Sequence, residues 1–213
     1  MRLKPEGVSN AADAMAAIEK FVFEEEMVTL PQLVEILKNN WEGNQVLQMK
    51  MINEGAKFGN GQKEADNLAC EMVNYFVERV EAYNSRYGDL IFSPCIATFS
   101  WIVNIGKRIG ASADGRMSKD PIAANMSPVP SRDVSGPTAA LNSYLKLSTD
   151  SMAAGAPIDL RVSLSGQVGE EGTRRIAAMI KTFIQMGGWS AYYTLLSKES
   201  QKVHLKRVEH GLA

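Results

Sequence analysis

The sequence has few of the residues that build metal sites and disulfide frameworks. Only two of its 213 residues are cysteines, Cys70 and Cys95, and only two are histidines, His204 and His210. Their spacings match no zinc-binding pattern, so we expect no bound metal and two reduced thiols in a reducing compartment. The two histidines fall in a polar C-terminal helix pattern, where we expect solvated side chains.

An excess of positive charge is also missing. The 23 basic and 24 acidic side chains nearly cancel, and no basic cluster is interleaved with aromatic residues. Nucleic-acid-binding proteins usually carry such a cluster, so we expect no nucleic-acid partner.

Long apolar runs are absent as well. Residues 1–7 lack the apolar run of a signal peptide, and no window approaches the length of a membrane span. We therefore expect a cytoplasmic protein with no membrane partner. With 213 residues, 45% of them hydrophobic, the chain is long enough for one sizeable core or two small domains.

The first third of the chain has the pattern of a helical scaffold. Ser9 or Asn10 can cap a first helix, whose apolar residues continue at helical spacing to Val22. Thr29 can cap a second helix, with Pro31 in its first turn.

Two further helices are predicted before Gly88. One covers residues 45–53, and the clearest helix of the sequence covers 63–86. Cys70 lies next to the apolar stripe of this long helix, so we expect a packed structural thiol. The stripe, in which apolar residues recur three and four positions apart, consists of Ala65, Leu68, Ala69, Met72, Val73, Phe76, Val80 and Tyr83.

The middle of the chain changes to a strand-like composition. Residues 90–105 are apolar, β-branched and aromatic, which predicts a buried strand or strand pair, including a strand at 96–104. Regular pairing is expected to begin only after Pro94, because proline cannot donate to a strand ladder. Cys95 beside this strand is expected to be a packing residue. Residues 157–164 alternate apolar and polar side chains and predict another strand.

Between these strands lies a tract rich in glycine and proline, residues 110–136, whose recurring apolar residues favour an ordered loop. Asp114 and Arg116 stand out in it. They can form a structural turn in which the arginine pairs with an acid, because Asp-Gly is a common turn dipeptide. Alternatively, the segment from Asp114 to Arg116 contacts a substrate anion. A short helix is expected to open at Pro137 or Thr138.

A last amphipathic helix pattern begins at Gly169 and ends in an uncharged stretch from Met186 to Tyr193. Two glycines followed by aromatic residues do not resemble a flexible linker, which would be more polar. One interpretation is a helix C-cap, with Gly187 or Gly188 just past the helix end. Alternatively, one glycine loses a Cα hydrogen and holds the unpaired electron in a flattened backbone, which a β-carbon would hinder.

Three motifs occur in order along the chain. They are G-A-S-A-D-G-R at Gly110 to Arg116, S-P-V-P-S-R-D-V-S-G-P-T-A-A-L-N-S-Y-L-K-L at Ser127 to Leu147, and G-G-W-S-A-Y at Gly187 to Tyr192. Together they resemble the C-terminal part of the glycyl radical enzyme family, which includes pyruvate formate-lyase and its dehydratase, decarboxylase and C–N or C–S lyase relatives. The helical segment from Asn10 to Tyr87 is similar to the lead-in of the lyase and dehydratase branch.

The resemblance implies an α/β fold, namely the C-terminal part of a ten-stranded barrel, with a helical N-terminal third and few strands. Two loops at the centre of that barrel carry a glycyl radical and a cysteine that relays it as a thiyl. On this alignment Gly188 is the radical position, and Gly187, Trp189, Ser190 and Tyr192 support and shield the loop. No cofactor is implied within the chain. A partner, an activating enzyme that uses an iron–sulfur cluster and S-adenosylmethionine, installs the radical.

The chain departs from the family pattern in two respects. Intact members are several times longer, and their relay cysteine lies upstream of the part resembled here, so neither Cys70 nor Cys95 inherits that role. Members also have a further strand and helix between the helix that ends near Phe183 and the radical loop. Here that helix runs directly into the glycines, and Gln185 stands in place of the usual arginine. We therefore expect a truncated and internally deleted member.

The resemblance also suggests a division of the chain. Residues 1–88 are expected to form the helical scaffold of a pyruvate formate-lyase-like domain, 89–168 a barrel strand and loop segment, and 169–213 a shortened glycine radical domain.

Two functions stay open. In the first, the chain is the radical-bearing part of a lyase, dehydratase or formate acetyltransferase of anaerobic metabolism, beside another chain that supplies the cysteine. In the second, it is a catalytically silent fragment or interaction module. An incomplete barrel leaves open strand edges in either case, so we also expect self-association.

Overall fold

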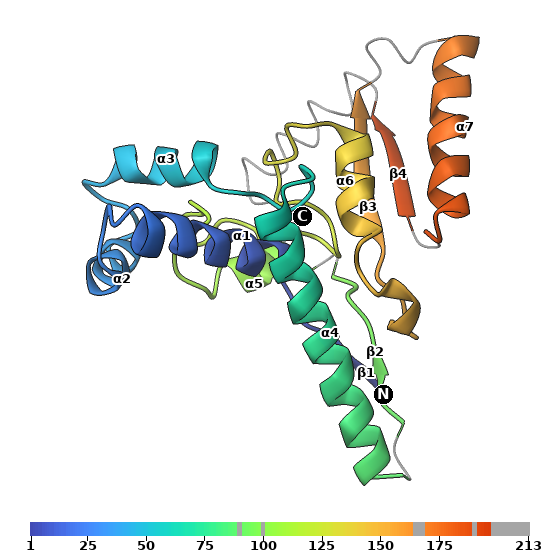
Figure 1. Ribbon diagram of the computed structural model, residues 1–213, viewed down its shortest axis with the longest axis horizontal. Helices are drawn as coiled ribbons and strands as arrows, with labels where there is room; N and C mark the ends of the chain where they lie inside the picture. The colour runs from blue at the N-terminus through green and yellow to red at the C-terminus, as the bar shows by residue number, and fades with distance from the viewer. Residues whose placement is uncertain (89–90, 99–100, 164–168, 189–190, 197–213) are drawn as a thin grey trace.

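The structure is a computed structural model that describes residues 1–88, 91–98, 101–163, 169–188 and 191–196 (Figure 1). This part of the chain is mostly helical. A π-helical segment, Glu19–Glu24, continues the first helix, and a 3-10 turn covers Thr149–Ser151. The helices are α1 Val8–Ile18, α2 Leu30–Lys38, α3 Gln45–Glu54, α4 Lys63–Arg86, α5 Ile102–Gly106, α6 Pro137–Tyr144 and α7 Glu170–Gln185.

The described strands form two separate parallel pairs. β1 Arg2–Leu3 pairs with β2 Ser93–Pro94, and β3 Ile158–Ser163 pairs with β4 Ala191–Leu196. Helix α7 connects β3 to β4, as a crossover between parallel strands requires. The expected α/β character, with a helical first third and few strands, is confirmed at this coarse level.

A local sequence signal explains the start of α2. Thr29 caps α2 with a complete capping box, in which its hydroxyl accepts from the Gln32 N–H and the Gln32 side chain accepts from the Thr29 N–H. The predicted cap of α1 was wrong, because Gly7 is its N-cap. Ser9 and Asn10 are buried inside the helix instead and bond to the loop beyond α5.

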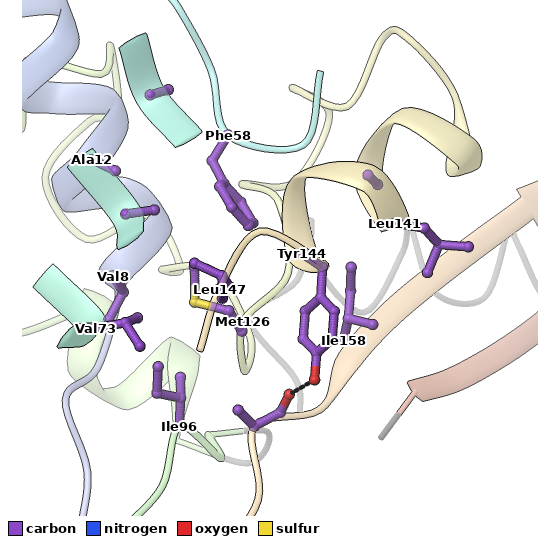
Figure 2. Close-up of a cluster of buried hydrophobic side chains, with 14 of the residues drawn as sticks. Val8, Ala12, Phe58, Val73, Ile96, Met126, Leu141, Tyr144, Leu147 and Ile158 are labelled. Atoms are coloured by element: carbon purple, nitrogen blue, oxygen red, sulfur yellow. Dashed lines mark hydrogen bonds between the residues drawn. The ribbon is translucent and has the colours of Figure 1, made fainter. Parts of the chain in front are cut away.

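One core joins segments that are far apart in the sequence. Helix α1 packs on α4, and the apolar sides of both helices meet α6, β3 and the loops around them (Figure 2). Tyr144 lies fully buried in this core and donates its hydroxyl proton to the Ala156 carbonyl oxygen at 2.5 Å. A second cluster, around Phe21, Leu33 and Trp41, holds α2 and α3 against the end of α1.

Two predictions for the middle of the chain were wrong. Residues 96–104 do not form a strand in their described part, since residues 95–98 have no regular structure and 102–106 belong to α5. Strand pairing was also expected to begin only after Pro94, but Pro94 is itself the last residue of the two-residue strand β2. The apolar composition of residues 96–104 arises in part from burial and not from a strand. Ile96, for example, is only 1% exposed and lies in the core.

The long helix α4 confirms its predicted bounds and most of its stripe. Ala65, Ala69, Val73 and Val80 are buried, whereas Tyr83 is 57% exposed. The second half of α4 extends away from α1 (Figure 1), so the stripe has no core to enter near its end. No helix within the described ranges combines the length and the apolarity that a bilayer crossing demands.

Candidate functional site

The turn after α7 is built as a Schellman motif. The helix ends at Gln185, Met186 is its C-cap, and Gly187 follows with φ of 90°. The Gly187 N–H donates to the Ile184 carbonyl at 3.1 Å, and the Gly188 N–H donates to the Phe183 carbonyl at 2.9 Å. These two bonds satisfy the last carbonyls of the helix. The C-cap interpretation is therefore confirmed, with Gly187 as the left-handed residue.

Gly188 has a different environment from its neighbour. It is buried, and a β-carbon built on it would lie 2.4 Å from two atoms of the Phe183 ring. Nothing lies within 4 Å of a β-carbon built on Gly187. Gly187 is thus required by its backbone conformation, and Gly188 by the closeness of the Phe183 ring.

The turn leads directly into a parallel strand. β4 begins at Ala191, and its Ala191 and Tyr192 pair with Ile158 and Asp159 of β3. The expectation that the helix runs straight into the glycines is confirmed. The strand β4 that follows the glycines was not among the strands predicted from the sequence.

The other predicted residues of this loop are only partly described. Trp189 and Ser190 lie outside the described residues, as do His204 and His210. The backbone of Tyr192 belongs to β4, and its side chain is not described.

The loop at 110–116 forms a buried turn. The Ser112 N–H donates to the Arg116 carbonyl, and the Gly115 N–H donates to the Ser112 carbonyl, both at 3.0 Å. Asp114 is 1% exposed, and its carboxylate accepts from the Asn10 side-chain amide at 2.7 Å and from the Ser112 hydroxyl at 2.5 Å. The Gln48 side-chain amide donates to the Gly115 carbonyl at 2.9 Å, which ties the turn to α3.

Arg116 bonds mainly to backbone carbonyls. Its guanidinium donates to the carbonyls of Met117 at 2.9 Å and Asp120 at 3.0 Å, to that of Gly110, and to the Ser112 hydroxyl at 3.2 Å. Burial lowers the pKa of Arg116 from its ordinary value, and Asp114 and Asp120 oppose that shift. With its donors directed at protein oxygens, the arginine acts as a structural brace of the turn. Arg116 forms no ion pair with any described acid, so the predicted pairing of its side chain with an acid was wrong.

Sequence reasoning missed a buried acid and a buried amine. Asp13 is fully buried in α1, where its Oδ1 accepts from the Phe58 N–H at 2.6 Å. Lys57 is 3% exposed, and its ammonium donates to the carbonyls of Met51 at 2.7 Å and Gly55 at 3.1 Å. Burial raises the pKa of Asp13 well above its usual range and lowers the pKa of Lys57. The sequence signal for the buried acid was the position of Asp13 on the apolar side of α1, one helical turn before Ala17.

Both cysteines are packed, as predicted. Cys95 is buried after β2, and the half-buried Cys70 donates to the Lys146 carbonyl at 3.4 Å. Burial raises the pKa of each thiol, so neither has the lowered pKa of an activated nucleophile.

Two family models match the chain in succession. The model described as "Pyruvate formate lyase-like" matches residues 1–106, and the model described as "Glycine radical" matches residues 122–203. Together they cover the helical scaffold and the β3–α7–β4 unit. The buried turn at 110–116 lies in the gap between the two matches.

Curated relatives and a solved structure agree with these matches. The chain is 27% identical to the probable dehydratase YbiW of Escherichia coli K12, covering 91% of this chain and 25% of the relative. It is 28% identical to an isethionate sulfite-lyase of Oleidesulfovibrio alaskensis, covering 91% and 23%. The glycerol-bound B12-independent glycerol dehydratase from Clostridium butyricum superposes with a TM-score of 0.86 and 29% identity, over 98% of this chain and 26% of that one. The chain thus spans about a quarter of the length of these relatives.

Proposed function

This chain belongs to the glycyl radical enzyme family, and on that premise we propose that it is a scaffold segment in which the Gly187–Gly188 turn has a structural role. The observation that supports the proposal most directly is the Schellman motif. Both glycines are accounted for, one by its left-handed backbone and the other by the Phe183 ring. The turn needs two glycines whether or not either of them stores a radical.

The order of elements supports the same conclusion. The family resemblance places a further strand and helix between the helix near Phe183 and the radical loop. In this chain β4 starts only after Gly188. Gly188 therefore occupies the turn that enters the strand, ahead of the position expected for a radical loop.

The barrel is the second part of the proposal. We infer that β3 and β4 are neighbouring strands of a ten-stranded α/β barrel, with α7 as the crossover on its outer side. Their parallel pairing over six residues and the helix between them are the features that such a barrel repeats. The remaining strands would come from the part of the enzyme that the relatives have in addition.

A second candidate is radical storage at Gly188, which one observation favours. The Gly188 Cα is buried under an aromatic ring, and a backbone radical needs shelter from water and dioxygen. In this alternative an activating enzyme with an iron–sulfur cluster and S-adenosylmethionine removes the hydrogen. Another chain then supplies the relay cysteine, because radical transfer requires the two centres to be held nearly in contact.

Electron paramagnetic resonance separates the two candidates. The full chain is incubated anaerobically with a radical activase that activates an intact homologue under the same conditions. The scaffold role predicts no glycyl doublet at Gly188. Gly188→Ala alone would strain the fold, because its methyl group would collide with the Phe183 ring. The matched pair is therefore Phe183→Ala and the double variant Phe183→Ala, Gly188→Ala, in which the ring is absent.

Each outcome has a definite meaning. A doublet in Phe183→Ala that disappears in the double variant assigns the radical to Gly188 and overturns the scaffold proposal. A doublet that survives in both leaves Gly188 structural and directs attention to Gly211, the only glycine C-terminal to β4. A flat spectrum in both, beside an activated homologue, supports the scaffold role.

A further inference from the structure

A groove runs between helices α2 and α3, at the end of the molecule away from the β3–α7–β4 unit (Figure 1). Its volume is about 770 Å³. The lining residues of each helix recur three and four positions apart, so each helix gives one side to the groove. We call it the α2–α3 groove. Its apolar lining consists of Met27, Val28, Pro31, Ile36, Val46 and Leu47.

The α2–α3 groove is open to solvent. Val46 is 86% exposed and Met27 is 47% exposed, whereas Val28 is buried. A small-molecule site encloses most of its ligand, which a groove with such exposed sides cannot do. An amphipathic helix needs only its apolar side covered and leaves its outer side in water. The open shape therefore favours a helix as the occupant, and the flexible Met27 side chain can adapt to it.

The surroundings of the groove are acidic. Residues 23–54 contain six glutamates and two lysines and no other charged side chain, which gives a net charge of −4 in a chain whose total is −1. Glu35 lines the groove, and Glu26 and Glu42 each precede a lining residue. All three are exposed, so they are available to a partner at the surface.

Both lysines of this segment already have carboxylate partners. The Lys50 ammonium lies 3.3 Å from a Glu25 carboxylate oxygen, and the Lys38 ammonium lies 2.7 Å from one of Glu35. Among the residues that the structure describes, three other glutamates of the segment take part in no ion pair, namely Glu24, Glu26 and Glu42. The charge that remains unpaired around the groove is therefore negative.

We propose that the α2–α3 groove binds a basic amphipathic helix of a partner protein. The apolar side of that helix packs on Ile36, Val46 and Leu47, and lysines or arginines along its borders pair with the glutamates around the groove. Specific interfaces have an apolar centre and a polar rim, and complementary charge speeds the encounter. An acidic helix would meet like charge in the same place and is disfavoured. This inference does not depend on the role of Gly188.

A synthetic peptide is the probe for this site. It is about 18 residues long and consists of leucine and lysine, with the leucines three and four positions apart so that they share one side of a helix. A second peptide has glutamate in place of every lysine, and a third has the first composition in an order that mixes both residues around the helix. Fluorescence anisotropy with the full chain measures each Kd. The first peptide is expected to bind at least about tenfold more tightly than the other two, and less tightly at high salt.

Val46→Lys locates the binding site. Val46 is so exposed that the substitution should leave the fold intact, but it puts a positive charge where the leucines of the peptide would pack. We expect it to weaken binding of the first peptide by at least about tenfold. Val134→Lys is the matched control, because Val134 is 85% exposed and does not line the groove. It is expected to bind the peptide as the unchanged chain does.

Charge reversal beside the groove tests the complementarity. The double variant Glu26→Lys, Glu42→Lys is expected to weaken binding of the basic peptide by at least about tenfold and to strengthen binding of the acidic one. Its control is Glu71→Lys, Glu78→Lys, which changes the net charge equally at exposed positions of α4. A general attraction to a more acidic protein would make both double variants alike, which would overturn the proposal.

Two further results would also overturn it. One is equal binding of all three peptides, or equal losses in Val46→Lys and Val134→Lys. The other is occupation of the groove by a second copy of the chain, which sedimentation equilibrium would show as a dimer that Val46→Lys dissociates and that the basic peptide does not displace.

Discussion

The ring of Phe183 lies 2.4 Å from the point that a β-carbon on Gly188 would occupy. The two residues are also joined by a hydrogen bond from the Gly188 N–H to the Phe183 carbonyl, across the end of α7. This arrangement makes position 188 accessible to glycine alone while the ring stays in place. A glycine there therefore has a packing explanation that is independent of any radical chemistry.

Gly188→Ala is expected to destabilise the chain by about 1–3 kcal/mol, because the added methyl group overpacks the turn. The free energy of unfolding from urea denaturation gives the measurement. In a Phe183→Ala background the same substitution should cost less, since the colliding ring is gone.

Gly187→Ala is the control for this pair. It is expected to cost roughly 1–2 kcal/mol through its left-handed backbone, with no relief from Phe183→Ala. Equal costs of Gly188→Ala in both backgrounds would show that the Phe183 contact does not explain the glycine.

Sequence patterns were most reliable where one local interaction decides the structure. The capping box at Thr29, the helix at 63–86 and the strand at 157–164 follow from caps and periodicity, and all three are present. The strand predicted at 96–104 failed because β-branched and aromatic residues also suit a buried irregular segment. Ile96 packs there with its N–H bonded to the Gly155 carbonyl.

The candidate site was predictable only in part. The turn at Asp114 could be anticipated from its dipeptide, and one of the two glycines as a helix cap. The hydrogen-bond partner of Asp13 could not, because the Phe58 N–H belongs to a segment that meets α1 only in the folded chain. The role of Arg116 depends likewise on carbonyls that no sequence pattern reveals.

Arg116→Lys is expected to destabilise the chain by about 1–3 kcal/mol. Lysine keeps the charge but loses the planar fork that reaches several carbonyls at once, which leaves buried acceptors unpaired. Thermal or urea unfolding measures the effect, with the exposed Arg174→Lys on α7 as the control expected to stay within about 0.5 kcal/mol. An unchanged unfolding midpoint for Arg116→Lys would remove the structural role and favour the anion-contact alternative.

Tyr144→Phe is expected to cost about 1 kcal/mol, because it removes the hydrogen bond to the buried Ala156 carbonyl while keeping the ring. Burial raises the pKa of Tyr144 to about 12. An unfolded tyrosine titrates near pH 10, so the unchanged chain should lose stability between about pH 10 and 12, where the unfolded state ionises first.

The phenylalanine variant should lack the Tyr144 part of this alkaline loss. Tyr83→Phe, at an exposed position, is the control for both measurements. If Tyr144→Phe and Tyr83→Phe behave alike at neutral and alkaline pH, the buried hydroxyl contributes nothing.

Asp13 gives the chain a pH dependence of the opposite sense from that of a salt-bridged carboxylate. Its folded pKa is raised by burial, so between the unfolded value near 4 and the raised value the folded state binds more protons than the unfolded state. Stability from this group is complete below about pH 4 and is lost as the pH rises through the folded pKa. Its slope is at most about 1.4 kcal/mol per pH unit.

Asp13→Asn isolates that contribution, since the amide oxygen can still accept from the Phe58 N–H but cannot ionise. Urea denaturation from pH 4 to 8 should show the unchanged chain losing stability relative to Asp13→Asn as the pH rises. Asp150→Asn, at an exposed aspartate, should give a curve parallel to that of the unchanged chain. Parallel curves for Asp13→Asn and the unchanged chain would mean that the buried carboxyl keeps an ordinary pKa, with the Lys57 ammonium compensating for its burial.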